Sequence, residues 1–418
     1  MRLPAPPPQP SRRSEHALDG FVFFLADVLT GFGPFLAVYL TSEHWTQFDI
    51  GLVLTTGSLV ALVGQVPGGA LVDAVRSPRL LAGAALAAIG VSALALATWP
   101  LFPVVAAAAV LQAAAACVLG PAIAAISLGL VGHTAIGARL GRNARFASLG
   151  TAAAAVAMGA SGYFVSNRSV FFVTAGFVLP ALVSLSLIRE KEIDPERAHG
   201  GVDAEDAEPR RRRRVVRLRS LARRHALIVF AACAALFQLA NAAMLPLMAG
   251  AVTVRAGQYA TVLVAASVVV PQLVVAALSP WIGRRAQDWG RRPVLLLGFS
   301  MVPLRGVLLA VVHDPFWLVA VQILDGITAS VFAVMAPLVV ADVSRGTGRF
   351  NLSFGLVGMA MGIGASLSTT LAGYISDHLG SAAAFLCLAG IAVAGLALVW
   401  ARMPETGPKK QGKDGAGA

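Results

Sequence analysis

Three ionisable side chains fall inside long apolar stretches of the sequence. Asp27 follows Asp19 by eight residues, which is about 12 Å along a helix that rises 1.5 Å per residue. By the same rise, Asp325 lies about 15 Å and Arg305 about 18 Å into two later stretches. Ionisable groups at such depth in a membrane are functional candidates, because hydrocarbon solvates a charge poorly. We therefore expect Asp27, Asp325 and Arg305 to couple a proton to the protein's activity.

Each of these assignments has a structural alternative. Asp27 either binds and releases a proton, or accepts hydrogen bonds from neighbouring helices without titrating. Arg305 and Asp325 form either a permanent buried pair that fixes helix register, or a pair that opens when a proton or an anionic substrate arrives. The sequence leaves both choices open.

The stretches that carry these residues predict a membrane protein. Of the 418 residues, 57% are hydrophobic and 13% are charged, against about 25% charged in soluble domains. A helix needs about 20 apolar residues to cross the bilayer. The sequence predicts twelve such helices, at 18–41, 50–72, 80–99, 101–131, 146–166, 169–188, 226–250, 258–282, 294–312, 315–341, 353–376 and 381–401.

The net charge of +12 follows the predicted topology. With the N-terminus inside, 33 − 3 = 30 of the Lys and Arg residues are cytoplasmic, the exceptions being Arg168, Arg255 and Arg305. This positive-inside pattern predicts that both termini are cytoplasmic. The basic character therefore indicates contact with anionic lipid and argues against a nucleic-acid partner.

Two loops repeat one frame. Residues 69–81 read GALVDAVRSPRLL and residues 283–297 read GRRAQDWGRRPVLLL, so the offset is 283 − 69 = 214. The same offset superposes Asp27 on Asn241, since 241 − 27 = 214. Such a repeat in a very apolar chain predicts two related bundles joined in the middle. We expect a disordered cytoplasmic tail at 1–17, a six-helix bundle at 18–188, a charged cytoplasmic linker at 189–225, a second bundle at 226–402 and a tail at 403–418.

Uncharged polar residues also occur inside the apolar stretches. The amide of Asn241 cannot titrate, so we expect it to hydrogen-bond a substrate. The sequence contains no Ser/His/Asp set, no HExxH motif, no metal-ligand spacing and no phosphate-binding loop, so it predicts neither an enzyme nor a cofactor. Four glutamines are candidates for a cavity lining, although each also fits a hydrogen bond between helices: Gln65, Gln112, Gln238 and Gln322.

The repeated loops resemble the signature G-x-L-x-D-R-x-G-R-R between the second and third spans of the major facilitator superfamily. The first copy keeps Gly69, Leu71 and Asp73 but has Ala74 and Arg76 in place of Arg and Gly. The second copy keeps Gly283, Gly290, Arg291 and Arg292, with Gln287 in the Asp position and Asp288 beside it. The resemblance covers roughly residues 18 to 402. It implies an all-α fold of twelve transmembrane helices in two pseudo-symmetric six-helix bundles.

The resemblance also implies that these loops form a cytoplasmic gate. Gly69 would let the second span approach the eleventh closely. Asp73 would lie near the N-terminus of that helix, where the helix dipole favours negative charge, and near an arginine. We assign Arg291 and Arg292 to the positive-inside pattern alone. The other gate candidates are Arg76, Arg145, Gly283, Asp288 and Gly290.

A transporter with a central cavity and alternating access is implied by the resemblance. Because no nucleotide-binding motif is present, the energy would come from an ion gradient, and the acids within the spans favour protons. We predict efflux of a small organic molecule by a monomer in a bacterial cytoplasmic membrane. Proton-coupled uptake of a metabolite or siderophore-like compound, and a non-transporting sensor or scaffold, are the alternatives.

Overall fold

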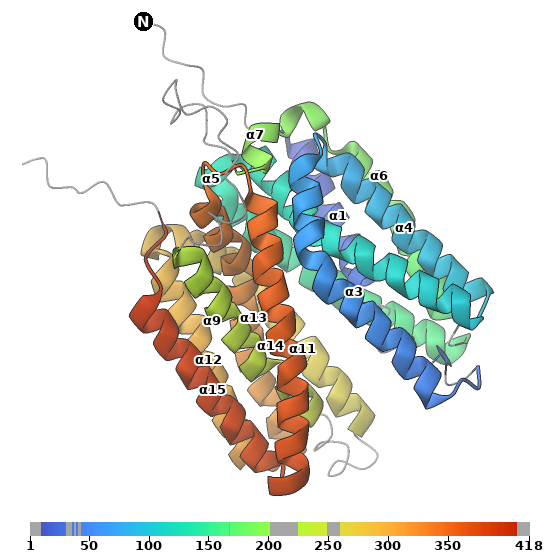
Figure 1. Cartoon of the computed structure of the whole chain (residues 1–418), viewed down its shortest axis with the longest axis vertical. Coiled ribbons are helices and arrows are strands. Elements are labelled where there is room, and N and C mark those ends of the chain that lie inside the picture. Colours follow the sequence, from blue (N-terminus) through green and yellow to red (C-terminus); the bar gives the residue numbers. More distant parts are fainter. Residues whose placement is uncertain are drawn as a thin grey trace, which may run out of the picture.

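The chain folds into two helical bundles that lie side by side (Figure 1). The computed structural model describes residues 10–30, 36, 39–40, 43–166, 168–200, 225–248 and 260–407, and every regular element in them is helical. The first bundle contains α1 (Arg12–Thr30), α3 (Gln47–Ala74), α4 (Pro78–Thr98), α5 (Phe102–Phe164) and α6 (Ser169–Leu187). The second contains α9 (His225–Asn241), α11 (Ala260–Trp289), α12 (Arg291–Val311), α13 (Pro315–Ser344), α14 (Phe350–Leu379) and α15 (Ser381–Arg402). The linker begins with a 3-10 turn, η1 (Glu190–Glu192), and a short helix, α7 (Pro195–Ala198).

Ten helical runs in the described residues are long and apolar enough to cross a membrane. The run in α5 extends over 61 residues, which is enough for two spans of about 20 residues and a connection. We predicted separate spans at 101–131 and 146–166, and the connection between them is also helical. The only break is at Gly132, where φ is 69° and ψ is −179°. Glycine tolerates this backbone conformation because it lacks a Cβ.

The first helix begins earlier than the sequence predicted. α1 starts at Arg12, so the tail expected at 1–17 is shorter than proposed. Ser14 is fully buried, and the backbone N–H and the hydroxyl of Ser11 both donate to Glu192 Oε2, at 3.0 Å and 2.9 Å. These contacts tie the start of α1 to the linker. Residues 1–9, most of the linker and residues 408–418 lie outside the described part of the chain.

Each bundle has its own core of buried apolar side chains. The second core also includes Leu128, Ile136 and Leu140 of α5, so the middle of α5 packs against the second bundle. Large apolar side chains such as Val63, 67% exposed, point outward from the helices. This is expected on surfaces that contact lipid. The predicted all-α, two-bundle fold is confirmed.

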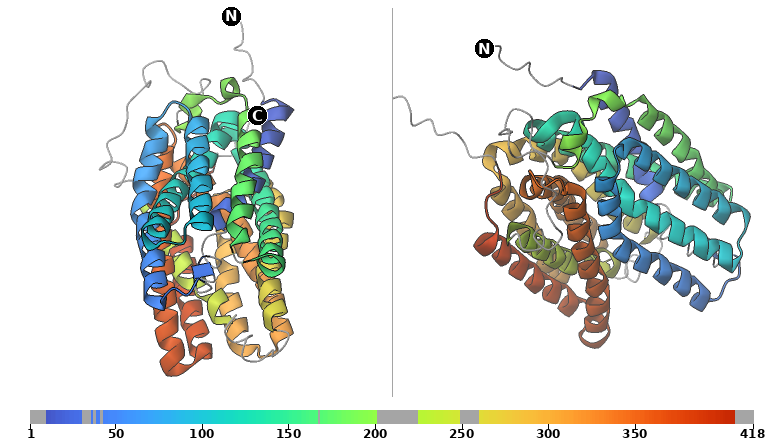
Figure 2. Two further views of the ribbon diagram at one scale, coloured as in Figure 1. Left: turned by 90° about the vertical axis from the view of Figure 1, so that its right-hand side faces the viewer. Right: turned by 45° about the horizontal axis from the view of Figure 1, so that its top comes forward.

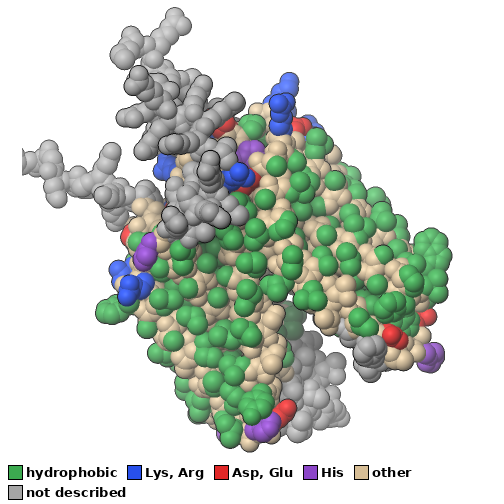
Figure 3. Space-filling view, viewed as in Figure 1, with side chains coloured by type: hydrophobic (Ala, Val, Ile, Leu, Met, Phe, Trp, Pro, Cys, Tyr) green, Lys and Arg blue, Asp and Glu red, His purple; other side chains and the backbone are tan. Residues whose placement is uncertain are grey.

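The bundles touch at one end and diverge at the other (Figures 1 and 2). The closed end carries the start of α1, the linker helix α7 and the last turn of α15. Lys and Arg side chains gather near this end in the space-filling view, and the surface between the bundles is hollowed at the opposite end (Figure 3). The arginine distribution predicts that the closed end is cytoplasmic.

Candidate functional site

Three polar residues, from two helices of the second bundle, surround the guanidinium of Arg305 on a third helix. Nη1 of Arg305, on α12, donates to Oδ1 of Asn241 at 2.8 Å and to Oδ1 of Asp325. Nη2 of Arg305 donates to Oε1 of Gln322 at 2.7 Å. The Asn241 amide also donates to Asp325 Oδ1, at 3.4 Å. Gln322 and Asp325 are one turn apart on α13, and Asn241 ends α9, so the structure brings together four residues singled out in the sequence.

The charges of this network differ in their access to solvent. The side chain of Arg305 is 1% exposed and that of Asp325 is 17% exposed. Gln322 is fully buried. Both hydrogen bonds to Asp325 go to Oδ1, so within the described residues Oδ2 accepts none. The network therefore encloses its cation and leaves one carboxylate oxygen available to a proton or to a hydrogen-bond donor.

The remaining cavity candidates lie elsewhere. Position 27 is in α1, but the side chain of Asp27 is outside the described part of the structure. Gln65 lies in the contact between α3 and α14, where a Cβ on Gly358 would come within 2.8 Å of Gln65 Oε1. Gln112 on α5 and Gln238 on α9 are half-buried, and among the described residues neither is bonded to the Arg305 network.

Glycines bring α3 and α14 into backbone contact at the closed end. A Cβ on Gly69 would lie 2.1 Å from the carbonyl oxygen of Asn351. A Cβ on Gly355 would lie 2.2 Å from the carbonyl oxygen of Gln65. No side chain fits at either separation, so these positions require glycine for the two bundles to touch.

A second seam, between α5 and α11, repeats the first. A Cβ on Gly283 would lie 2.2 Å from the Gly137 carbonyl, and one on Gly141 would lie 2.4 Å from the Ser279 carbonyl. The four pairs of equivalent positions share the offset of the repeated loops, because 283 − 69, 351 − 137, 279 − 65 and 355 − 141 all equal 214. The internal repeat therefore relates the two seams.

Asp73 accepts hydrogen bonds from the first residues of α14. Its Oδ1 accepts from the backbone N–H of Asn351 at 3.2 Å and from the Asn351 amide at 2.8 Å, and its Oδ2 accepts from the Leu352 N–H at 2.8 Å. A carboxylate at a helix N-terminus is stabilised by free N–H groups and the helix dipole. At the equivalent position of the other seam, the amide of Gln287 donates to the Thr134 carbonyl at 2.6 Å.

Other residues of the expected gate lie apart from these seams. Within the described residues, no ion pair joins Asp73 to Arg76 or Arg145, both of which are exposed. Asp288 is 65% exposed and lies 3.8 Å from Arg285 on the same helix, so Gln287 rather than Asp288 reaches the other bundle.

The two loop residues at the start of α12 have contacts within their own bundle. Gly290 precedes α12 with φ at 94°, and a Cβ there would lie 2.6 Å from Oε2 of Glu405. Arg291 was assigned to topology alone, but it is 2% exposed and its Nε lies 2.7 Å from Asp342 Oδ2. That assignment therefore needs correction, because a buried, paired arginine also fixes α12 against α13.

One buried cluster was not predicted. Arg139 Nη2 lies 2.6 Å from Asp19 Oδ1, Arg142 pairs with the other oxygen of Asp19, and both Arg139 and Asp19 are buried. Arg139 Nε also donates to Asn143 Oδ1 at 2.8 Å. These contacts join α1 to α5 just beyond Gly132. The sequence predicts Asp19 within the span 18–41, but it places the two arginines between the spans 101–131 and 146–166, so their pairing with Asp19 was not expected.

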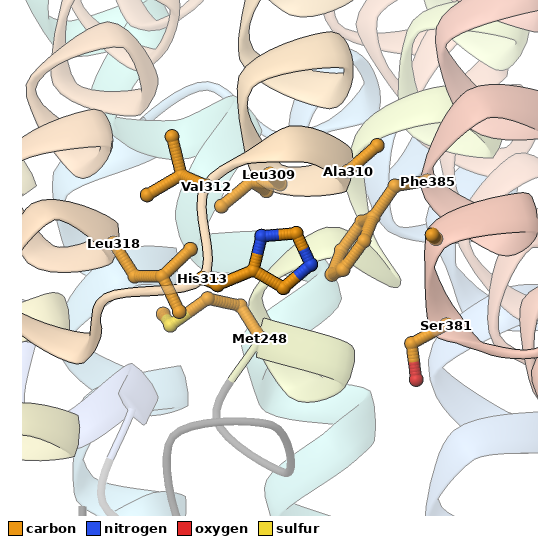
Figure 4. A pocket seen from close by; sticks show the side chains of 9 residues that line it. Met248, Leu309, Ala310, Val312, His313, Leu318, Ser381 and Phe385 are labelled. Atoms are coloured by element: carbon orange, nitrogen blue, oxygen red, sulfur yellow. The ribbon is translucent and has the colours of Figure 1, made fainter. Parts of the chain in front are cut away.

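A small cavity of about 40 Å³ lies in the second bundle (Figure 4), among residues at the end of α12 and the starts of α13 and α15. Met248, Leu318 and Phe385 make its lining largely apolar, and His313 contributes a polar ring. Leu309 also lines it, one helical turn beyond Arg305, so the cavity approaches the Arg305 network from the open end. In the described part of the chain, no group of three or more His, Cys, Asp or Glu is placed to hold a metal ion.

Comparisons with known proteins agree with this architecture. The family model of the Major Facilitator Superfamily matches residues 20–270 and again residues 227–418. An uncharacterized MFS-type transporter of Mycobacterium tuberculosis is 41% identical over 406 residues, covering 96% of this chain and 95% of that protein. The class B tetracycline resistance protein of Escherichia coli is 34% identical over 109 residues, covering 25% of this chain and 27% of that protein.

A solved structure shows the same fold. FucP, a major facilitator superfamily transporter in its outward conformation, superposes with a TM-score of 0.70 at 16% identity, over 92% of this chain and 98% of that chain. The family consists of transporters and not enzymes, which agrees with the prediction that no reaction is catalysed. The chain belongs to the major facilitator superfamily of membrane transporters.

Proposed function

We propose that this protein exports a small organic molecule across a bacterial cytoplasmic membrane, driven by an inward flow of protons. The observation that carries the proposal is the Arg305 network, which sets within the spans of the second bundle a carboxylate whose Oδ2 accepts no hydrogen bond from the described residues. A polar cluster of this kind is costly in a membrane and is typical of substrate or ion pathways.

Asp325 is the candidate for proton binding whose side chain lies in the described part of the structure. Its Oδ2 has no hydrogen-bond partner in the described residues, and its side chain is 17% exposed, so water can reach it. Arg305 and Asn241 hold the other oxygen, so a change in protonation would alter hydrogen bonds on three helices together. Asp27, the equivalent of Asn241 in the first bundle, is the second candidate.

In alternating access, the closed end of the protein would open while the open end closes. The glycine seams and the Asp73 contacts hold the two bundles together at the end that we take to be cytoplasmic. The hollow at the other end would then receive protons and release substrate (Figure 3). Rocking of one bundle against the other is the movement expected for two repeats joined by a linker.

Export is favoured over uptake by the partial similarity to the tetracycline resistance protein. The test uses cells with and without the gene, and the same cells carrying Asp325→Asn. Export predicts that deletion raises the cellular accumulation of some toxic compound and that Asp325→Asn does not restore the lower level. Lower accumulation after deletion would show uptake. A normal level with Asp325→Asn would contradict the role of this carboxylate.

A further inference from the structure

The first residues of the linker pack against the first bundle. Ala198 is fully buried and Ile193 is 6% exposed, and both pack into the core of that bundle. The backbone N–H of Asp194 donates to the carbonyl of Gly129 on α5 at 3.0 Å. Residues 194–200, which we call the linker segment, are therefore anchored to the first bundle.

The linker segment also bonds to the second bundle. Its last three carbonyls accept hydrogen bonds from the connection between α13 and α14 and from the first two residues of α14. Gly200 accepts from the Gly346 N–H at 2.8 Å, and His199 accepts from the Phe350 N–H at 3.3 Å. Ala198 accepts from the side-chain amide of Asn351 at 3.3 Å. Three consecutive linker residues thus cross the seam between α3 and α14.

Asn351 connects the three elements that meet at this seam. It is fully buried, and its carbonyl faces Gly69 of α3. Its backbone N–H and its amide donate to Asp73, and the same amide donates to Ala198 of the linker segment. One side chain therefore holds α3 and the linker segment against the N-terminus of α14.

The equivalent seam between α5 and α11 lacks this arrangement. The position equivalent to Asn351 is Gly137, which has no side chain, and the position equivalent to Asp73 is Gln287. Among the described residues, the side-chain hydrogen bond across that seam is the one from Gln287 to the Thr134 carbonyl. The two equivalent seams therefore differ, because the linker segment bonds across only the one between α3 and α14 among the described residues.

We propose that the linker segment and Asn351 are positioning elements of the transport cycle, which hold the cytoplasmic end closed. The linker then does more than join the bundles, because it sets how often the closed end opens. This inference rests on the alternating access proposed for the protein. Opening would break the three hydrogen bonds of the linker segment and the three of Asp73. A typical hydrogen bond contributes about 1 kcal/mol, or about fivefold in an equilibrium.

Two glycines offer a matched pair of variants. Gly200 has φ at 79°, and an added Cβ would lie 2.9 Å from the Cβ of Phe350. Gly348 has φ at 64°, and an added Cβ would meet no atom within 4 Å. Gly200→Ala and Gly348→Ala share the cost of a left-handed backbone. Only Gly200→Ala also pushes the linker segment away from α14. Asn351→Ala removes the side-chain bonds without touching either glycine.

The test measures the separation of the bundles in the full-length protein in lipid nanodiscs, without substrate. Spin labels at the exposed positions Arg76 and Arg284 report the cytoplasmic end by double electron–electron resonance, in a background without the native cysteines. We expect Gly200→Ala and Asn351→Ala each to raise the ratio of open to closed molecules about fivefold or more. Gly348→Ala should match the unmodified protein.

Asp73→Ala separates the inference from the proposed function on which it rests. If Asp73→Ala opens the cytoplasmic end while Gly200→Ala and Asn351→Ala behave like Gly348→Ala, the role of the linker segment is refuted and alternating access stands. If no variant produces an open population, alternating access fails and the inference fails with it.

Discussion

Replacing Arg305 alone should destabilise the second bundle far more than replacing Arg305 and Asp325 together. Removing one partner of a buried ion pair costs about 3–5 kcal/mol, because the other charge stays buried without compensation. Arg305→Met would also leave the fully buried Gln322 oxygen without its donor, at about 1–3 kcal/mol. The Asp325 side chain is 17% exposed, and this partial exposure reduces the first cost. We expect a loss of about 4 kcal/mol.

The double variant Arg305→Met/Asp325→Leu removes the uncompensated charge and leaves only the amide groups to be satisfied. It should lose about 1–3 kcal/mol, so the coupling energy between the two positions should be at least about 2 kcal/mol. The surface pair Arg285 and Asp288 provides the control. Their side chains are 44% and 65% exposed and 3.8 Å apart, so their coupling should stay below about 0.5 kcal/mol.

The assay is unfolding in mixed micelles titrated with sodium dodecyl sulfate and followed by circular dichroism, with both cycles measured under the same conditions. Transport gives a second readout, because exchanging the charges with Arg305→Asp and Asp325→Arg should restore activity that either single change abolishes. A coupling energy no larger than that of the surface pair would refute the buried network as a stabilising pair. Recovery no better than the single variants would refute its role in transport.

Three further predictions concern the closed end and the linker. Gly69→Ala places a Cβ 2.1 Å from a carbonyl of α14, so it should abolish transport and leave the cytoplasmic end open. The control Gly373→Ala, whose added Cβ meets no atom within 4 Å, should transport normally in the same vesicles. Asp73→Asn removes the charge from the N-terminus of α14, and should raise cytoplasmic labelling of an introduced cysteine about tenfold, since such a cap is worth about 1–2 kcal/mol. Burial acts to raise the pKa of Glu192, but hydrogen bonds from Ser11 and Ser14 at the start of α1 prevail and lower the pKa below its ordinary value of 4.5. Their stabilising effect is therefore full above pH 4.5 and is lost as the pH falls through the lower folded-state value, and Glu192→Gln should remove this dependence in thermal unfolding scans between pH 3 and 6.

The architecture was predictable because lipid imposes simple rules on sequence. Apolar stretches of about 20 residues define the spans, and the offset of 214 between the loops at Gly69 and Gly283 defines the two bundles. The connection within α5 was missed because its charged residues resemble a loop, although nothing in it ends a helix before or after Gly132. Arg139 and Arg142 both pair with the buried Asp19, so these arginines mark a contact between α1 and α5 rather than a loop.

The candidate site was predictable only in part. Depth within a span identified Arg305, Asp325, Asn241 and Gln322 without indicating that all four meet, because depth gives height in the membrane but not the rotation of a helix. The gate residue Asn351 was missed, since asparagine near the start of a helix indicates only a possible cap, whereas here its amide donates to Asp73 of another helix. The repeat offset held the missing information, because it relates Asn351 to Gly137.

The most direct test of proton-coupled transport is the proton flux that a substrate induces in reconstituted vesicles. Purified protein in proteoliposomes containing a pH-sensitive dye would be screened across chemical classes of small organic compounds, beside vesicles with Asp325→Asn and vesicles without protein. We predict that at least one compound moves protons in the direction opposite to its own transport, and that Asp325→Asn abolishes this flux. Transport of a compound without any movement of protons, or an unchanged flux with Asp325→Asn, would contradict the proposed mechanism.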